Sequence, residues 1–296
     1  MSTEIDRKPP DTSTRADRVP ALVVDGVSKQ FRVRGRGKGV LTAVDNASFT
    51  IEPGSALGLV GASGSGKTTL ATMITGAIRP TSGSIKFGEF EVETLKSGGL
   101  RRYHRRVQMV FQDPYGALNP LHTVSYTVTR PLQNFLGMSV EQADARVHEL
   151  LDTVGLNPPE QYAAKLPHQL SGGQRQRVVI ARALACEPDL IIADEPVSML
   201  DVSLRAGVLR LLDELRQQRG LSLLYITHDL LSARVATENI IVLNQGRMVE
   251  RGNTKHVLQH PSDPYTIRLL DAVANPFELD ESHPEPSPAG KSGIRP

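Results

Sequence analysis

A glycine-rich segment, residues 61–68, carries the clearest chemical pattern in this chain of 296 residues. Its sequence GASGSGKT fits G-x-x-x-x-G-K-[ST], in which glycines let successive backbone N–H groups surround a phosphate. An apolar run, residues 56–60, precedes it like a buried strand, and residues 69–74 follow it like the start of a helix. The N-terminus of that helix adds partial positive charge, while Lys67 can reach the β- and γ-phosphates and Thr68 can hold Mg²⁺. This context favours a nucleotide site over a flexible glycine-rich turn. The residues expected to contact the nucleotide here are Gly61, Ser63, Gly64, Ser65, Gly66, Lys67, Thr68 and Thr69.

Two adjacent carboxylates, Asp194 and Glu195, follow a fully apolar run at residues 190–193 that is predicted to be a buried strand. Carboxylates at such a place are costly unless they meet a cation or a proton. We therefore expect Asp194 to face Mg²⁺, directly or through water. Glu195 is expected to orient and deprotonate an attacking water. The alternative, a pair of solvated loop acids, is disfavoured by the apolar strand before them.

Two more polar side chains follow predicted strands. Gln112 ends the apolar run 107–111, and His228 follows the apolar run 222–227. In parallel α/β sheets, ligand contacts gather at the carboxyl ends of the strands. A single histidine is more often structural, but its place on a neighbouring strand makes His228 a candidate for contact with the γ-phosphate.

A second potential anion site begins at Ser171, which is a good N-cap for a helix running to about residue 186. Gly172 and Gly173 leave the first amides of this helix uncovered. Taken alone, an ordinary capped helix is the simpler interpretation. Asp201 is expected to cap a further helix that runs to about residue 218.

Composition narrows the class of protein. Hydrophobic residues make up 39% of the chain and the net charge is +2, so a large core is possible and no global field favours nucleic acid. No apolar run has the length of a membrane span, and the first residues lack the apolar core of a signal peptide. The single cysteine, Cys186, excludes a disulfide framework and a multi-cysteine metal site. We therefore expect a cytosolic protein.

The two ends of the chain, residues 1–20 and 278–296, are polar and rich in proline, and we predict that both are disordered. Near the first end, β-rich residues 22–24 and 48–51 flank a basic, glycine-rich loop at residues 32–39. A solvated hairpin tip is the favoured interpretation of this loop, over a phosphate or nucleic-acid patch.

The middle of the chain, from residue 113 to about 170, has a helical character between predicted strands. Residues 139–142 form a capping box, and an apolar stripe from Val140 to Val154 stops at Gly155. Such an insertion between two strands predicts a helical subdomain.

With these patterns in view, the chain resembles the nucleotide-binding subunit of an ATP-binding cassette transporter, from about residue 21 to residue 276. The most specific feature is LSGGQRQR at residues 170–177 placed shortly before DEP at residues 194–196, a pairing that other phosphate-loop NTPases lack. The resemblance implies an α/β fold: a RecA-like phosphate-loop NTPase core with an antiparallel β subdomain and an inserted helical subdomain. The cassette and its C-terminal extension would occupy residues 21–277.

The resemblance also implies roles for single residues. Phe31 is similar to the aromatic that stacks on adenine, although tyrosine is common there, and Gln112 resembles the loop glutamine that contacts Mg²⁺ and the membrane partner. Residues 198–201 resemble the D-loop, with Met199 where alanine is usual, and His228 resembles the switch histidine. The implied catalytic residues are Lys67, Gln112, Glu195 and His228. The implied Mg²⁺ ligands are Thr68, Gln112 and Asp194. The implied nucleotide contacts outside the phosphate loop are Phe31, Ser171, Gly172, Gly173, Gln174 and Asp201.

Three segments point to one group within that superfamily. FQDPYGALNP at residues 111–120, DEPVS at residues 194–198 and HPSDPY at residues 260–265 are similar to the oligopeptide, dipeptide and nickel import group. Some relatives carry an iron–sulfur cysteine cluster near the C-terminus, but this chain has no cysteine there. The resemblance implies an ATPase for the import of di- or oligopeptides, with nickel or another small solute as the alternative.

The implied partners follow from the family mechanism. Two cassette subunits, identical or different, would sandwich two Mg·ATP and drive a membrane permease at the cytoplasmic face, with a solute-binding protein acting indirectly. Nucleic acid is not an expected partner. Cassette ATPases of chromosome maintenance carry coiled-coil insertions or zinc cysteines, and translation-factor cassettes usually have two copies per chain; neither feature is present. Intact Glu195 and His228 argue against a non-hydrolytic regulator.

Overall fold

The computed structural model describes residues 19–33 and 39–274. The predicted disordered tails lie outside the described residues, except for residues 19 and 20, and Val19 is buried. Most of the predicted basic hairpin tip, residues 34–38, also lies outside them.

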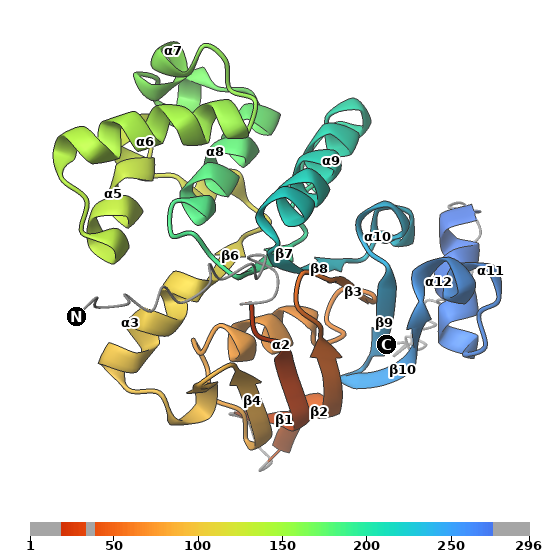
Figure 1. Ribbon diagram of the computed structural model, residues 1–296. Helices are drawn as coiled ribbons and strands as arrows, with labels where there is room; N and C mark the ends of the chain where they lie inside the picture. Colours follow the sequence, from red (N-terminus) through yellow and green to blue (C-terminus); the bar gives the residue numbers. More distant parts are fainter. Residues whose placement is uncertain (1–18, 34–38, 275–296) are drawn as a thin grey trace, which may run out of the picture.

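The larger sheet has the strand order β10-β9-β3-β8-β7-β6 within the described residues (Figure 1). All neighbouring pairs are parallel except β9 with β10, which form an antiparallel hairpin. The strands β3, β7 and β8 are buried along their whole length, which explains their continuous apolar sequences. The strand bounds are β3 Ala56–Val60, β6 Val107–Val110, β7 Leu190–Asp194, β8 Ser222–Thr227, β9 Asn239–Asn244 and β10 Arg247–Asn253.

The smaller sheet is antiparallel and has the order β2-β1-β4-β5. Leu22 pairs with Ile51 in its first hairpin, so the two predicted β-rich segments are partners, although both strands are longer than predicted. One apolar cluster joins this sheet to the larger sheet. It contains Leu59 of β3 and Ile74 of the helix that follows the phosphate loop. The strand bounds are β1 Leu22–Val33, β2 Gly39–Ile51, β4 Ser82–Phe87 and β5 Phe90–Glu91.

A helical lobe, residues 114–169, projects from the sheets, and Figure 1 shows α5, α6 and α7 stacked at its outer end. Its capping box at Ser139 and Gln142 forms as predicted, but Val140 is 71% exposed and does not belong to the apolar stripe. Val140 starts the helix beside its cap, where its side chain faces solvent. The elements of the lobe are α4 Pro114–Ala117, α5 Val124–Leu136, α6 Val140–Thr153, α7 Pro159–Ala163 and the 3₁₀ turn Pro167–Gln169.

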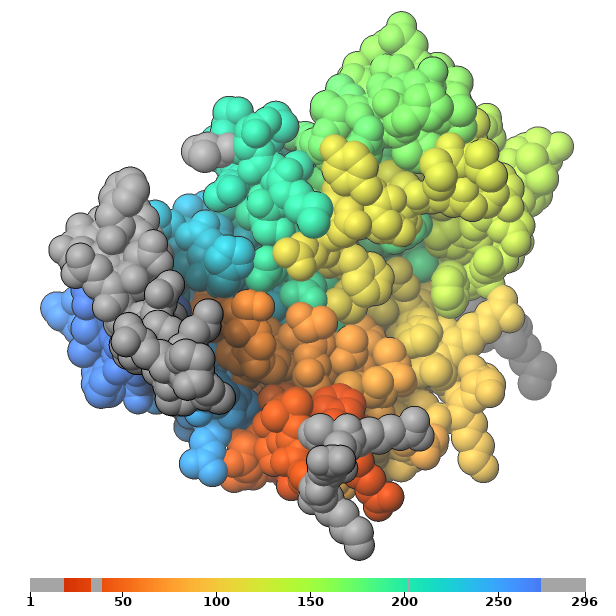
Figure 2. Space-filling view, turned by 180° about the vertical axis from the view of Figure 1, so that it is seen from behind, coloured from red at the N-terminus to blue at the C-terminus, as the bar shows by residue number. Residues whose placement is uncertain are grey.

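The remaining helices cover the sheets and connect the lobe to them. α8 and α9 share one apolar cluster with the lobe and with β7 and β8, so the insertion is fused to the core of the larger sheet. The helical lobe and the C-terminal segment α11–α12 lie at opposite ends of the molecule in both views (Figures 1 and 2). The bounds are α2 Lys67–Ile74, the 3₁₀ turn Val92–Thr94, α3 Ser97–Arg106, α8 Gly172–Leu184, α9 Val202–Arg219, α10 Leu230–Ala236, α11 Thr254–Gln259 and α12 Pro264–Ala274.

None of the helices described between residues 19 and 274 is both long enough and apolar enough to cross a bilayer.

Candidate functional site

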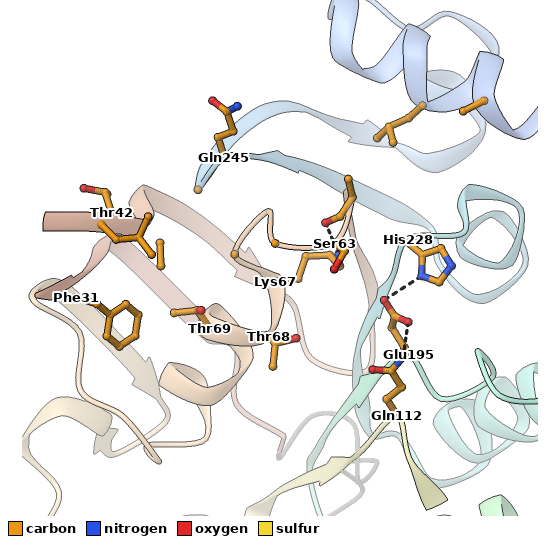
Figure 3. Close-up of a pocket in the computed structure, with 18 residues that line it drawn as sticks. Phe31, Thr42, Ser63, Lys67, Thr68, Thr69, Gln112, Glu195, His228 and Gln245 are labelled. Carbon is orange, nitrogen blue, oxygen red and sulfur yellow. Dashed lines mark hydrogen bonds and ion pairs between the residues drawn. The ribbon is translucent and has the colours of Figure 1, made fainter. Parts of the chain in front are cut away.

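A cavity of about 1170 Å³ opens beside the N-terminus of α2 and brings together most of the residues predicted from the sequence. Figure 3 shows Phe31 at one end and His228 at the other, with Lys67 and Thr68 between them. The predicted residues that line the cavity are Phe31, Ser63, Gly64, Gly66, Lys67, Thr68, Thr69, Gln112, Glu195 and His228.

The glycines of the phosphate loop are required by close backbone packing. A Cβ on Gly61 would lie 2.1 Å from the carbonyl oxygen of Leu243, and one on Gly66 would lie 2.3 Å from that of Ala43. Gly64 has a φ of +77° and nothing within 4 Å of its absent Cβ. The loop is therefore pressed against the β2 and β9 backbones on one side and open at Gly64.

The loop offers donors to an anion. Lys67 is 5% exposed, and its Nζ donates to the carbonyl oxygens of Gly61 at 2.7 Å and Ala62 at 2.9 Å. Burial lowers the pKa of Lys67, while the carboxylates of Glu195 and Asp194 act in the opposite direction. The Ser65 hydroxyl is buried without a hydrogen-bond partner among the described residues. An orphaned hydroxyl and a lysine held by carbonyl groups fit a loop that accepts phosphate.

The side chains of Asp194 and Thr68 are in contact, although the two residues are 126 positions apart in the sequence. The Thr68 hydroxyl donates to Oδ2 of Asp194 at 3.1 Å. Burial raises the pKa of Asp194, and the Glu195 carboxylate adds to this, while the Thr68 hydrogen bond and Lys67 lower it. A hydroxyl oxygen beside a carboxylate is a suitable donor set for a hard divalent cation, so these residues fit Mg²⁺.

Glu195 connects two neighbouring strand ends by hydrogen bonds. Gln112 Nε2 donates to its Oε2 at 3.1 Å, and His228 Nδ1 donates to its Oε1 at 3.0 Å (Figure 3). An ionised carboxylate only accepts, so Nδ1 carries the proton in this contact. Glu195 also has a φ of +47°, an uncommon conformation for a side-chain-bearing residue that is typical of functional positions. The strands β6, β7 and β8 thus deliver an amide, a carboxylate and an imidazole to one point.

Phe31 lies half-exposed at the far end of the cavity, where β1 and β2 pair. Leu41 is its partner across the hairpin, and the Lys29 ammonium lies 5.3 Å from the centre of its ring. Phe31 therefore lines the cavity with a basic residue nearby, and its stacking on a base stays a prediction.

Sequence reasoning missed several lining residues. They are Leu41, Thr42, Ala43, Ala62, Gln245, Gly246, Leu269 and Ala272. The β9–β10 turn at Gln245 and Gly246 was visible in the sequence as a glycine turn, whereas the place of Leu41 opposite Phe31 follows only from the pairing of β1 with β2. The residues of α12 had no local signal.

The second predicted anion site is not in this cavity. Ser171 is exposed at the start of α8, where its hydroxyl accepts from the Gln174 amide at 3.3 Å and its own amide donates to Gln174 Oε1 at 3.0 Å. The Gln174 side-chain amide also donates to the Tyr162 hydroxyl at 3.1 Å. A Cβ on Gly173 would lie 3.3 Å from Leu204, so this glycine also permits α8 to pack on α9. Gly172, between Ser171 and Gly173 in the sequence, is half-buried.

Asp201 precedes α9 as predicted, but its side chain accepts no hydrogen bond from the helix. The cap is made by its backbone instead, since its carbonyl oxygen accepts from Leu204 at 2.9 Å and Arg205 at 3.1 Å. The exposed carboxylate lies outside the cavity lining.

Comparison with known proteins places this geometry in a family. The model of the family described as ABC transporter matches residues 44–198. A curated protein from Brucella abortus (strain 2308), named as a peptide import ATP-binding protein, is 45% identical over 253 residues, which cover 84% of this chain and 75% of that one. A protein of the same description from Brucella ovis is 42% identical over 260 residues, covering 87% and 80%.

Solved structures of ATP-binding cassettes have a fold similar to that of this chain. The dimeric ATP-binding cassette MJ0796 bound to ADP and Pi superposes with a TM-score of 0.70 at 33% identity, covering 79% of this chain and 98% of that one. The protein cbiO1 from Clostridium perfringens, part of the ABC transporter complex cbiONQ, gives a TM-score of 0.72 at 26% identity, covering 88% and 96%. The chain therefore belongs to the ABC transporter family, as an ATPase subunit with the phosphate-loop NTPase fold.

Proposed function

We propose that this ATPase subunit powers the uptake of di- and oligopeptides through a membrane permease. The observation that carries the ATPase part is the meeting of Gln112, Glu195 and His228 in the cavity that also holds Lys67. The peptide part is supported by the names of the Brucella relatives at 42–45% identity.

In the proposed reaction, the phosphate loop amides and Lys67 bind the phosphates of ATP, and Phe31 stacks on the adenine. Glu195 accepts a proton from a water whose oxygen bonds to the γ-phosphorus as the bond to ADP breaks. The hydrogen bonds from Gln112 and His228 hold the Glu195 carboxylate in place until then. Thr68, Asp194 and Gln112 would hold Mg²⁺, which neutralises phosphate charge when bound.

We also propose that Ser171, Gly172, Gly173, Gln174 and Asp201 contact the nucleotide held by a second cassette subunit. They lie outside their own chain's cavity, and helix α8 presents its N-terminus with Ser171 exposed. The dimeric state of the MJ0796 structures supports this arrangement. The partner is then a second copy of this chain or a different cassette subunit.

The permease is proposed to dock on residues 111–126. This segment exposes the large apolar side chains of Phe111, Tyr115, Leu121 and Tyr126. Exposed apolar residues clustered in one segment are typical of a protein contact. Gln112 belongs to this segment and donates a hydrogen bond to Glu195. Docking that moves the segment would therefore change the position of the proposed catalytic carboxylate. The subunit would therefore work peripherally, at the cytoplasmic face of the membrane.

Growth and uptake experiments test the proposal. A strain lacking this chain should lose growth on a dipeptide supplied as the only source of a required amino acid. The wild-type chain should restore growth, and Glu195→Gln should not. Loss of nickel uptake with intact peptide uptake would contradict the peptide assignment and leave the ATPase assignment standing.

A further inference from the structure

The C-terminal segment reaches back to the phosphate loop. The hydroxyl oxygen of Tyr265, in α12, accepts a hydrogen bond from the backbone N–H of Ala62 at 2.8 Å, across 203 residues of sequence. Farther along the same helix, Leu269 and Ala272 line the nucleotide cavity. Figure 3 shows α12 beside the loop on the side of Ser63. The helix is thus both a wall of the cavity and a direct contact of the loop.

Ala62, which receives the contact from Tyr265, is hydrogen-bonded to other residues of the phosphate loop. Its carbonyl oxygen accepts from Lys67 Nζ at 2.9 Å and from the Ser65 amide at 3.2 Å. Its N–H is bound by Tyr265, so both polar groups of the residue are engaged. The next residues, Ser63 and Gly64, are exposed and line the cavity. The orientation of Ala62 therefore affects the open part of the loop, while Lys67 keeps a second and shorter hydrogen bond, to the Gly61 carbonyl oxygen at 2.7 Å.

Tyr265 is itself held firmly. Its ring packs against the apolar cluster that contains Val60 and Val242, next to the loop and the β9 strand. Its amide donates to Asp263 Oδ1 at 2.7 Å. Glu250 on β10 in turn accepts from the Asp263 amide at 3.2 Å. This chain of contacts fixes the hydroxyl relative to the larger sheet.

From this geometry we infer that Tyr265 is a positioning residue that holds the phosphate loop in its nucleotide-binding shape. The inference rests on the proposed function of the loop as the ATP site. Without the hydroxyl, the Ala62 N–H turns to water and the loop samples more conformations, so ordering it adds to the cost of binding ATP. Tyr265 is not among the residues that line the cavity, and Lys67 keeps its hydrogen bond to Gly61 without it, so we expect the chemical step to change little.

The test compares Tyr265→Phe, which keeps the ring and removes only the hydroxyl, with wild type. The KM for ATP should rise about two- to tenfold, the range expected for one lost hydrogen bond, while kcat stays within about twofold. Hydrogen exchange of the Ala62 amide, measured on the full chain without nucleotide, should accelerate in parallel.

Tyr103→Phe is the matched control. The Tyr103 hydroxyl donates to the carbonyl oxygen of Ile74 at 2.5 Å, so this variant also removes one phenol-to-backbone hydrogen bond, away from the loop. It should lower Tm without changing the KM for ATP. Equal KM values for Tyr265→Phe and Tyr103→Phe, or unchanged exchange at Ala62, would overturn the inference.

Two further results distinguish failure of this inference from failure of the proposed function. If Tyr265→Phe does not fold, Glu250→Gln replaces it, because that variant loosens the start of α12 but retains the tyrosine. An unchanged KM for ATP in Glu250→Gln would then overturn the inference. If wild type binds no ATP, the proposed function fails, whereas faster Ala62 exchange in Tyr265→Phe would still show that the hydroxyl positions the loop.

Discussion

At the scale of single residues, the structure restricts both the side chain and the backbone of Glu195. It bonds to Gln112 and His228, pairs its amide with Ile226 at 2.8 Å and has a positive φ. A carboxylate that lines a cavity and is held by two donors is restricted in direction, which would suit a base that must meet a particular water. Its hydrogen-bond partners come from the neighbouring strand ends.

Glu195→Gln should abolish steady-state hydrolysis while ATP binding remains. An amide has nearly the same shape but cannot accept the proton, and loss of a general base typically lowers the rate by about 10²–10⁴. Phosphate release and ATP-dependent dimerisation by light scattering are the measurements. Turnover close to that of wild type would show that another group is the base.

Gly61→Ala should damage the loop through steric overlap. The added Cβ would lie 2.1 Å from Leu243 O, against the β9 backbone, which cannot move away without breaking the sheet. Overpacking of this kind costs about 1–3 kcal/mol, and ATP affinity should fall with Tm. Gly98→Ala is the control, because nothing lies within 4 Å of its Cβ position. A Gly61→Ala variant that matches Gly98→Ala in both measurements would contradict the argument.

At the scale of elements, the start of α12 is attached to β10 by Glu250. This carboxylate accepts from the Ser262 amide and hydroxyl, both at 2.8 Å, and from the Asp263 amide. Burial raises the pKa of Glu250, but the hydrogen bonds from Ser262 and Asp263 outweigh it and leave the pKa below its ordinary value of 4.5. The ionised form is therefore favoured by the fold.

This shift makes the contribution of Glu250 depend on pH. Because its folded-state pKa is below the unfolded value, the stabilisation is fully present above about pH 4.5 and is lost as the pH falls through the folded-state pKa. Glu250→Gln should lower Tm at pH 7, and the difference from wild type should shrink below pH 4.5. Tm measured by circular dichroism from pH 7 to pH 3.5 tests this. A difference that stays constant with pH would mean that the charge of Glu250 has no role.

At the scale of the whole molecule, the predicted nucleotide contacts divide into two groups. Lys67 and its neighbours line the cavity, whereas Ser171 lies at the exposed N-terminus of α8. If two subunits pair symmetrically, each site takes Lys67 from one chain and Ser171 from the other. A mixing experiment can test this division.

Lys67→Ala and Ser171→Arg should each inactivate both sites of their own dimer. When the two dead proteins are mixed, each mixed dimer has one site with both defects and one site with none. Random pairing then returns roughly a quarter of wild-type ATPase activity if the sites act independently. No recovery in dimers proven to be mixed and to hold ATP would contradict independent shared sites. If the natural partner is a different cassette subunit, that pair must be used.

Local patterns in the sequence predicted the elements with strong periodicity or capping signals. The capping box at Ser139, the helix start at Ser171 and the buried strand before Asp194 all form where they were expected. Val140 and Asp201 were predicted less well. Periodicity does not say where a helix faces solvent at its first turn, and an N-cap residue type does not ensure a side-chain hydrogen bond.

The sequence by itself determined the phosphate loop, the polar residues at the strand ends and the family, because these depend on short spacings along the chain. Only the tertiary structure decided which distant groups meet. Thr68 bonds to Asp194 across 126 residues, and Tyr265 bonds to Ala62 across 203. The reason is physical: strand order in the larger sheet and the packing of α12 on the apolar cluster beside β3 set these meetings, and both depend on long-range burial that no local pattern encodes.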